Sequence, residues 1–403
     1  MRYIILQGDG MADYSQPGIS YQTPLEAADT PNMDRISSSG MIGLIDTIPP
    51  GMTAGSSVGN MSLMGLDPAE NFSGRAPLEA KGLGLNLGDD DLVFRCNLVK
   101  LGESERGTIM EDYSGGHLKS SEASSYIERL NKGIDEEEFD FYPGLSYRNL
   151  LVWKGAKRKV DWRKIDLTPP HDISGQAIDG HLPGGEAGDV LASLQERGSS
   201  LVESGENANA VWFWGAGVKP DVPTFKGRYG LSGAVISAVD LIRGLGSYAG
   251  LEPIDVPGAT GFIDTNYAGK VDAVLDSLTD DTLVYLHVEA PDEASHMGDL
   301  DLKIEAIERI DRKVLGPLID ALEGEEDVRI MVVTDHITSV ESKTHEPGAV
   351  PFAIADFPLK KNPRLVRFSE SNGCKNDRFN SGEALLDQFI VRDDVHRRAV
   401  GSP

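Results

Sequence analysis

Three short apolar runs in the sequence are each followed directly by acidic residues. The runs are residues 3–6, 283–288 and 330–333, and they consist mainly of Ile, Leu and Val. Continuous apolar runs of about four to eight residues are typical of strands that are buried on both faces of a parallel sheet. We therefore expect three core strands whose carboxyl ends carry the polar sequences GDG, EAPDEASH and TDH.

The three polar sequences are expected to meet in space. In open α/β sheets, ligands bind outside the carboxyl ends of the strands, so Asp9, Asp292 and Asp335 could converge there. Residues 301–322 have apolar positions at helical spacing and predict a crossover helix between the second and third strands. The pattern indicates an α/β domain that contains a βαβ unit.

The middle of the chain has a different pattern, which predicts an α+β insert. It contains four strand-like runs and two helical patterns: the runs are residues 94–99, 107–113, 147–155 and 211–217, and the helices are residues 120–132 and 186–203. A glycine-interrupted helical pattern at 228–250 is expected to return the chain to the first domain. We expect a discontinuous first domain of residues 1–74 and 220–403, and an inserted domain of residues 75–219.

The length and the net charge of the chain indicate how many domains it has and which kinds of molecule it can bind. The length of 403 residues favours two domains. The chain has 38 Lys and Arg against 64 Asp and Glu, which gives a formal net charge of -26. Such a surface repels nucleic acid and anionic lipid, and an anionic substrate would need local cations to overcome that field. The oligomeric state is left open.

The sequence lacks the marks of secretion and membrane insertion. The N-terminal sequence MRYIILQGDG has no apolar segment or cleavage site of a signal peptide, and no apolar run approaches the ~18 to 20 residues of a membrane helix. Cys96 and Cys374 have no CxxC spacing, so neither a disulfide framework nor a cysteine metal site is expected. We expect a cytoplasmic protein that binds neither nucleic acid nor membrane.

The acids and histidines near the strand ends are candidate metal ligands. Asp292 and His296 are four residues apart, so on a helix they share one face and can grip one ion. Taken alone, each residue has a structural explanation, such as a turn cap or an exposed helix position. Together they favour a site for Mn²⁺ or Zn²⁺, with Mg²⁺ possible where oxygen ligands dominate. The remaining candidates are Asp9, Asp335, His336 and His345.

The segment PGMTAGSSVGN, residues 50–60, offers a candidate nucleophile. Its small residues let the backbone approach a ligand and can expose Ser56 at the start of a helix, where free N–H groups attract anions. A flexible turn that caps a helix is the alternative. Beside bound cations, however, the Ser56 hydroxyl would become acidic enough to attack phosphorus.

Several basic residues are candidate clamps for a phosphate or carboxylate group. His117 and His171 are further candidates for binding the substrate, although a structural role is the simpler interpretation for lone histidines in loops. The cationic candidates are Arg75, Arg95, Arg148, Lys226, Arg228 and Arg243.

An ordered set of motifs identifies a family resemblance. The motifs are GDGMAD, TPLEAADTPNMDRI, AGSSVGNMSLMGLDP, SGRAPLEAKGLG, VFRCNLV, VPGATGFIDTN, APDEASH, TDH and KTH. The chain resembles, over nearly its whole length, the cofactor-independent phosphoglycerate mutases of the archaeal type, within the alkaline phosphatase superfamily. This resemblance implies an alkaline-phosphatase-like α/β fold, with a mostly parallel sheet flanked by helices and a smaller inserted α+β domain.

The resemblance also implies a mechanism with two bound divalent metal ions, Mn²⁺ first and Mg²⁺ or Zn²⁺ as alternatives. Asp292, His296 and His345 would hold one ion, and Asp9, Ser56, Asp335 and His336 would hold the other. Ser56 would take the phosphoryl group from 3-phosphoglycerate and return it to the other hydroxyl, which gives 2-phosphoglycerate. The inserted domain would hold the small phosphorylated substrate by its carboxylate.

The chain departs from the family pattern where the substrate should be chosen. Archaeal mutases carry an arginine-rich DRRAGR stretch, whereas residues 112–117 here read DYSGGH. In addition, Glu289 stands where a lysine is expected. The DYSGGH pattern resembles a bacterial branch that is proposed to act as a homoserine kinase.

Three functions are therefore compatible with the sequence. Phosphoglycerate mutase is the first, a phosphotransferase for homoserine or a similar small hydroxy compound is the second, and a non-catalytic, metal-stabilised binding protein is the third. Retention of Ser56 with the full ligand set argues against the third function.

Overall fold

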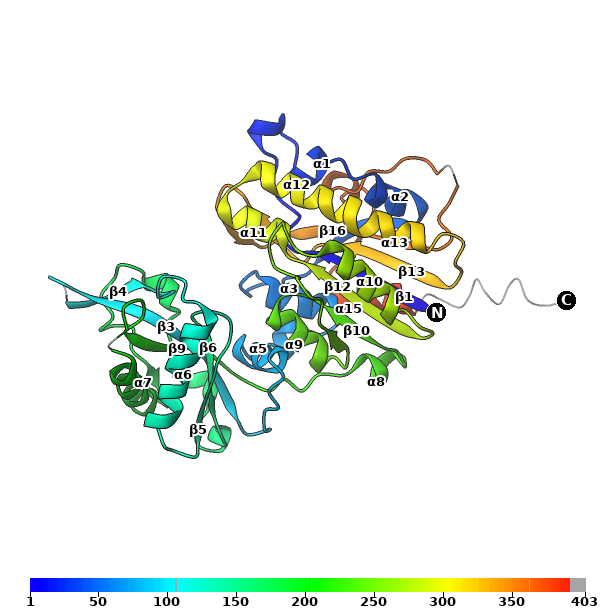
Figure 1. Cartoon of the computed structure of the whole chain (residues 1–403). Helices are drawn as coiled ribbons and strands as arrows, with labels where there is room; N and C mark the ends of the chain where they lie inside the picture. The colour runs from blue at the N-terminus through cyan, green and yellow to red at the C-terminus, as the bar shows by residue number, and fades with distance from the viewer. Residues whose placement is uncertain (106, 204, 362, 392–403) are drawn as a thin grey trace. The chain divides into compact units, whose positions relative to one another are not determined.

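A mostly parallel sheet of eight strands organises the first of two structural units (Figure 1). The computed structural model describes residues 1–105, 107–203, 205–361 and 363–391. Unit 1 comprises Met1–Phe72 and the chain from Asp221 onward, and unit 2 comprises Ser73–Pro220. Each unit has its own hydrophobic core.

The three apolar runs form the centre of the unit 1 sheet. β1 (Arg2–Gly8) lies between β12 (Thr282–Val288) and β13 (Val328–Val333), and both pairings are parallel. The full strand order is β11-β10-β12-β1-β13-β16-β2-β17. The outer strands are β10 (Ser232–Ile236), β11 (Glu252–Ile254), β16 (Ala349–Asp356), β2 (Met41–Asp46) and β17 (Asp377–Phe379). Among the strands of this sheet in the described residues, β16 runs opposite to the other seven, so the predicted α/β class with a mostly parallel sheet is confirmed.

Helices between β12 and β13 complete the predicted crossover. The helical path consists of α12 (Leu300–Ile310), a π-helical turn at Asp311–Leu315 and α13 (Gly316–Ala321). Its apolar residues pack with those of β1, β12 and β13 in one core cluster. The turn has a structural role, because the buried Asp311 carboxylate accepts hydrogen bonds from the backbone N–H groups of Asn32 and Met33. It thereby fixes the start of α2 (Pro31–Ser39).

The expected helix at 228–250 is wrong in its first half. This stretch contains the end of α8 (Phe225–Tyr229), then β10, and only then α9 (Asp240–Tyr248). Short apolar runs fit a helix and a buried strand equally well, and β10 becomes a strand because β12 and β11 pair with it on both sides.

Unit 2 is built on an antiparallel sheet. β3 (Leu92–Ser104) pairs with β4 (Gly107–Asp112), β6 (Arg148–Trp153) and β9 (Ala210–Val218), and β5 (Phe139–Tyr142) pairs with β6. α6 (Ser120–Gly133) and α7 (Gly188–Val202) pack with these strands in one core. The strands and helices predicted for the inserted segment are thus present.

Shorter elements complete the two units. They are α1 (Pro24–Ala27), α3 (Ser56–Leu63), α4 (Pro68–Asn71), α5 (Ala76–Gly82), α10 (Tyr267–Ser277), α11 (Ala290–Met297), α14 (Glu370–Gly373), α15 (Gly382–Ile390), β7 (Ile165–Asp166), β8 (Gly184–Gly185), β14 (Ile337–Ser339) and β15 (Thr344–Glu346). Within the described ranges, no helix has the length and apolar character needed to cross a membrane.

Candidate metal centre and nucleophile

Two groups of possible metal ligands lie at the carboxyl ends of the central strands. Asp9 follows β1, Asp335 and His336 follow β13, and α11 carries Asp292 and His296 just after β12. Because these strands are parallel neighbours, their ends meet at one edge of the sheet. The first group is Asp292, His296 and His345, the second is Asp9, Asp335 and His336, and in each group the potential ligand atoms lie within 4.8 Å of one another.

In the first group, three side chains converge on one point. The Nε2 atom of His296 lies 3.1 Å from Asp292 Oδ2 and 3.1 Å from the Nε2 atom of His345. His296 Nδ1 faces the backbone carbonyl of Lys343 at 2.9 Å, which can only accept, so Nδ1 carries a proton. The hydrogen bond to Asp292 raises the pKa of His296 to about 9. A divalent cation could replace the Nε2 proton.

In the second group, the Ser56 hydroxyl joins two carboxylates and an imidazole. His336 Nε2 lies 3.2 Å from Ser56 Oγ, 3.3 Å from Asp9 Oδ1 and 3.2 Å from Asp335 Oδ2. Burial lowers the pKa of His336 to about 3, so the ring is neutral. Three oxygens, from Ser56, Asp9 and Asp335, therefore lie within 3.3 Å of one imidazole nitrogen.

The charges of this second group fit a cation. Asp9 Oδ1 is buried and has no hydrogen-bond partner among the described residues. Burial, followed by the charge of Asp335, raises the pKa of Asp9 well above its usual value. Burial, followed by the charge of Asp292, raises the pKa of Asp335 to about 7. Packed carboxylates without a counter-charge are costly, and a divalent ion would supply that charge.

Residues behind the carboxylates hold them in place. His287 Nε2 donates to Asp9 Oδ2 at 2.8 Å, while Ser237 Oγ lies 3.0 Å from His287 Nδ1. This contact leaves Asp9 Oδ1 as the oxygen that faces the site. His287 was not among the residues expected at the site, although a histidine within the apolar run LVYLHV was the available signal.

Ser56 is the first residue of α3, which is fixed against the end of β13. The Asn60 side chain donates to the Ser56 carbonyl at 2.9 Å and to Asp335 Oδ2 at 2.8 Å. Tyr285 donates to Asn60 Oδ1 at 2.6 Å. A β-carbon at Gly59 would lie only 2.6 Å from the Asp335 carbonyl oxygen, so this close approach requires glycine. The half-buried Ser56 hydroxyl is thus presented by a rigid helix start.

Five of the predicted substrate-binding residues lie together in unit 2, and we name them the unit 2 cation cluster: Arg75, Arg95, His117, Arg148 and His171. The buried Arg95 guanidinium stacks on the Trp214 ring at 4.3 Å, and His171 meets the same ring edge-on at 5.2 Å. Tyr113 contacts the rings of His171 and Tyr147, and Tyr147 contacts the ring of His117.

The cluster brings the charges of three arginines, Arg75, Arg95 and Arg148, close enough to repel one another. Arg148 Nε donates to the Tyr147 hydroxyl at 3.2 Å, and the ion-pair partner of Arg95 is Glu79, at 3.0 Å. Burial, together with the charges of Arg75 and Arg148, lowers the pKa of Arg95 to about 10. An anion bound here would relieve this repulsion, which is notable in a chain of net charge -26.

The other predicted substrate-binding residues lie in unit 1 and already have partners or face solvent. Arg228 of α8 pairs with Glu383 at 2.7 Å and Asp387 at 3.0 Å. Arg243 of α9 pairs with Asp255 at 2.7 Å. Lys226 is exposed on α8. A substrate anion would have to displace carboxylates to reach either arginine.

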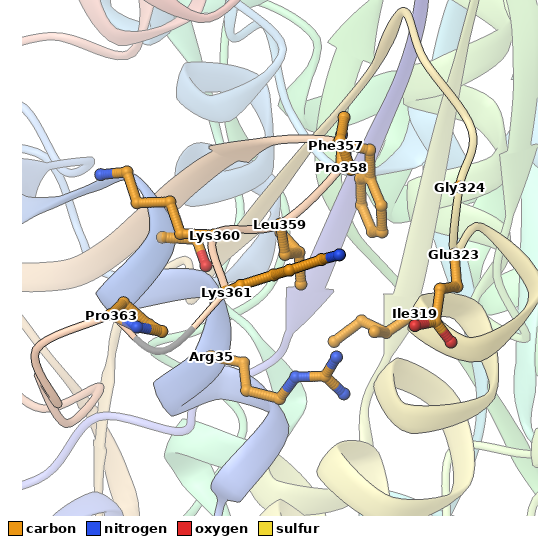
Figure 2. Close-up of a pocket in the computed structure, with 11 residues that line it drawn as sticks. Arg35, Ile319, Glu323, Gly324, Phe357, Pro358, Leu359, Lys360, Lys361 and Pro363 are labelled. Carbon is orange, nitrogen blue, oxygen red and sulfur yellow. The ribbon is translucent and has the colours of Figure 1, made fainter.

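A cavity of about 680 Å³ lies elsewhere in unit 1 (Figure 2). It is lined by Arg35 of α2, Ile319 of α13 and residues that follow β16, including Phe357 and Lys361. Because Asp356, at the end of β16, pairs with Arg329 near the start of β13, this cavity is at the amino ends of the parallel strands. It contains none of the predicted site residues.

Comparisons with known proteins point to one family. The family model described as 2,3-bisphosphoglycerate-independent phosphoglycerate mutase matches residues 37–206. A protein with that name from Methanothrix thermoacetophila is 47% identical over 367 residues, which cover 88% of this chain and 91% of the relative. One from Methanosarcina barkeri is 46% identical and covers 93% of this chain and 95% of the relative.

Solved structures share the fold. A protein from Pyrococcus horikoshii aligns with a TM-score of 0.81 and 26% identity, over 100% of this chain and 99% of that one. The cofactor-independent phosphoglycerate mutase of Thermoplasma acidophilum aligns with a TM-score of 0.64 and 22% identity, over 97% and 99% of the two chains. At 22% identity, the similarity to the Thermoplasma acidophilum structure is evidence for a shared fold and for nothing more.

Proposed function

Because the chain belongs to the family of 2,3-bisphosphoglycerate-independent phosphoglycerate mutases, we propose that it interconverts 3-phosphoglycerate and 2-phosphoglycerate. The observation that carries the proposal is the Ser56 hydroxyl, 3.2 Å from His336 Nε2 and beside two convergent groups of metal ligands. A hydroxyl placed beside divalent cations is a recurring arrangement for the transfer of phosphoryl groups.

The proposed metal ligands form two sets. Asp292, His296 and His345 would hold one divalent ion, and Asp9, Ser56, Asp335 and His336 would hold the other. Mixed carboxylate and imidazole ligands suit Mn²⁺, which we propose as the ion, with Mg²⁺ or Zn²⁺ as alternatives. When bound, the ions supply acidification of the serine hydroxyl and neutralisation of phosphoryl charge.

Ser56 is the proposed nucleophile. Its oxygen forms a bond to phosphorus as the bond from phosphorus to the substrate hydroxyl oxygen breaks, and that oxygen gains the equivalent of the proton that Ser56 loses. The glycerate then presents its other hydroxyl, which takes the phosphoryl group and returns Ser56 to its free form. The serine must hold its position through both steps, which Asn60 supports by fixing the start of α3.

The unit 2 cation cluster is proposed to bind the carboxylate of the glycerate. Arginine is the preferred partner of a carboxylate because its planar guanidinium donates two parallel hydrogen bonds. Tyr113 and His117 stand where the family pattern has arginines, and here both rings pack against Tyr147. We propose that aromatic contacts around fewer cations hold the substrate in this chain.

An assay of interconversion tests the proposal. Purified protein is loaded with Mn²⁺ and incubated with 3-phosphoglycerate in the absence of 2,3-bisphosphoglycerate, and the products are followed by ³¹P NMR. The expected result is a new signal from 2-phosphoglycerate. Protein that carries two ions and yields no 2-phosphoglycerate would contradict the proposal.

Two further experiments separate the mutase from the alternative functions. The names of the relatives favour the mutase over a phosphotransferase for homoserine and over a binding protein. Formation of O-phosphohomoserine from a phosphomonoester donor would support the phosphotransferase. Failure to trap a phosphorylated Ser56 with any phosphomonoester would support the binding protein.

A further inference from the structure

A threonine hydroxyl lies between the two groups of metal ligands. Thr338 is fully buried in β14, and its Oγ1 donates to Asp292 Oδ1 at 2.7 Å. The same oxygen lies 3.0 Å from His336 Nδ1. One hydroxyl therefore contacts a ligand from each group. Thr338 was not among the expected site residues, because its partner Asp292 is distant along the chain.

The position of Thr338 is fixed by its backbone. It pairs with His345 in the hairpin of β14 and β15, and its N–H donates to the Ala12 carbonyl at 3.2 Å. Its carbonyl accepts from the buried Lys303 ammonium at 2.6 Å. A β-carbon at Gly10 would lie 2.5 Å from Thr338 Oγ1, so glycine leaves the space that the hydroxyl occupies. These contacts leave the hydroxyl little freedom to turn away.

The hydrogen bond from Thr338 to Asp292 decides which atom is the donor between Thr338 and His336. A hydroxyl has one proton, and Thr338 donates it to the Asp292 carboxylate, which as an ionised group only accepts. Toward His336, Thr338 must therefore be the acceptor and Nδ1 the donor. A neutral imidazole with its proton on Nδ1 has a free lone pair on Nε2. That lone pair faces Asp9, Asp335 and Ser56.

We propose that Thr338 is a positioning residue that couples the two metal sites, because its hydroxyl sets the His336 tautomer and orients Asp292. The inference rests on the proposed metal binding and is independent of the substrate. Partners that hold metal ligands in place typically change affinity by about 10- to 100-fold when they are removed. If Thr338 couples the two sites, loss of its hydroxyl must weaken the binding of both ions.

The test is a titration of the metal-free protein with Mn²⁺, in which EPR reports the free ion. Thr338→Val keeps the shape of the side chain and removes the hydroxyl, which leaves His336 Nδ1–H and Asp292 Oδ1 without this partner. The expected result is a loss of about 10- to 100-fold in affinity for both ions. Thr338→Ser keeps the hydroxyl and is expected to bind both ions nearly as tightly as the parent.

A matched control is Thr30→Val. Thr30 is also a buried threonine, and its hydroxyl has no partner among the described residues. This variant should bind both ions like the parent. The proposal is overturned if Thr338→Val binds both ions with the parent's affinities, or if this variant has a lower affinity for only one ion. It is also overturned if Thr338→Ser loses as much affinity as Thr338→Val.

A second measurement keeps the proposal testable if Thr338→Val does not fold. In the Zn²⁺-loaded parent with ¹⁵N-labelled histidine, NMR should find the His336 proton on Nδ1, and a proton on Nε2 would contradict the account. Both readouts concern ion binding. A parent that binds two ions but converts no phosphoglycerate would therefore remove the proposed function and leave this inference standing.

Discussion

At the scale of single residues, the proposed phosphoryl transfer depends on the Ser56 hydroxyl as its nucleophile. Ser56→Ala should abolish phosphoryl transfer, with a loss of at least about 10⁴-fold, because no covalent intermediate can form. The other ligands, Asp9, Asp335 and His336, remain, so the protein should still bind two ions. ³¹P NMR and measurement of bound metal check the two outcomes. Transfer at the parent's rate would show that another residue is the nucleophile.

A second residue-scale prediction concerns Arg75 in the unit 2 cation cluster. If Arg75 contacts the substrate carboxylate, Arg75→Ala removes a charge-assisted hydrogen bond that is worth about 1.5–3 kcal/mol. The expected fall in kcat/KM for 3-phosphoglycerate is about 10- to 150-fold. Arg163→Ala is the control, because Arg163 is exposed on unit 2 and pairs with Asp161. Equal kinetics for both variants would remove Arg75 from the substrate site.

The protonation of single side chains predicts how ion binding depends on pH. In the ion-free state the hydrogen bond to Asp292 raises the pKa of His296 to about 9, so below that pH an ion must displace a proton from the ring. Mn²⁺ affinity at the first group should therefore rise with pH up to about 9 and then level off. Titrations from pH 6 upward measure this dependence. A flat profile would contradict the assigned contact.

The residues that the sequence could identify are those with distinctive chemistry. Acids and histidines stand out where an apolar strand ends, as at Asp335 and His336, so the ligand candidates could be chosen without coordinates. His287 and Thr338 could not, because each acts through a hydrogen bond to a residue far away in the chain. Hydrogen-bond partners of this kind become visible only when the strands are placed side by side.

At the scale of elements, a buried lysine ties α12 to the loops of the site. Lys303 Nζ donates to the Ala12 carbonyl at 3.2 Å, to Asp13 Oδ2 at 3.0 Å and to the Thr338 carbonyl at 2.6 Å. The side chains of Lys303 and Asp13 are fully buried. The pair thus anchors the turn after β1 and strand β14 to one helix.

Removal of this lysine should destabilise unit 1. Lys303→Met leaves the Asp13 carboxylate buried without its counter-charge, at a cost of about 3–5 kcal/mol in the free energy of unfolding. The double variant Asp13→Asn, Lys303→Met removes the stranded charge and should recover part of that loss. Urea unfolding of the parent and both variants measures the difference. A single variant as stable as the parent would contradict this role.

The elements that were predicted correctly are those in which the spacing of apolar residues fits only a strand or only a helix. β1, β12 and β13 are continuous apolar runs that end in polar turns, and α6 and α7 have clear helical spacing. β10 was assigned to a helix because its short run fits both periods. β16 was not among the expected strands. Proline is unusual in an inner strand, yet Pro351 lies within β16, which lies between β13 and β2.

At the scale of the whole molecule, the two separate cores predict two unfolding events. The candidate metal ligands all belong to unit 1, whose core shares no residue with that of unit 2. Mn²⁺ at about 100 times its dissociation constant should stabilise unit 1 by about 2.7 kcal/mol for each ion, and EDTA should reverse this effect. Calorimetry should show one transition that responds to Mn²⁺ and one that does not. Two responsive transitions, or none, would contradict the location of the site.

Distant segments of the chain are proposed to fold into a site for two ions beside one serine. Anomalous X-ray scattering from crystals of the Mn²⁺-loaded protein would locate these ions. Two manganese peaks are expected, one among Asp292, His296 and His345 and the other among Asp9, Asp335, His336 and Ser56. A single peak, or peaks remote from these side chains, would contradict the proposal.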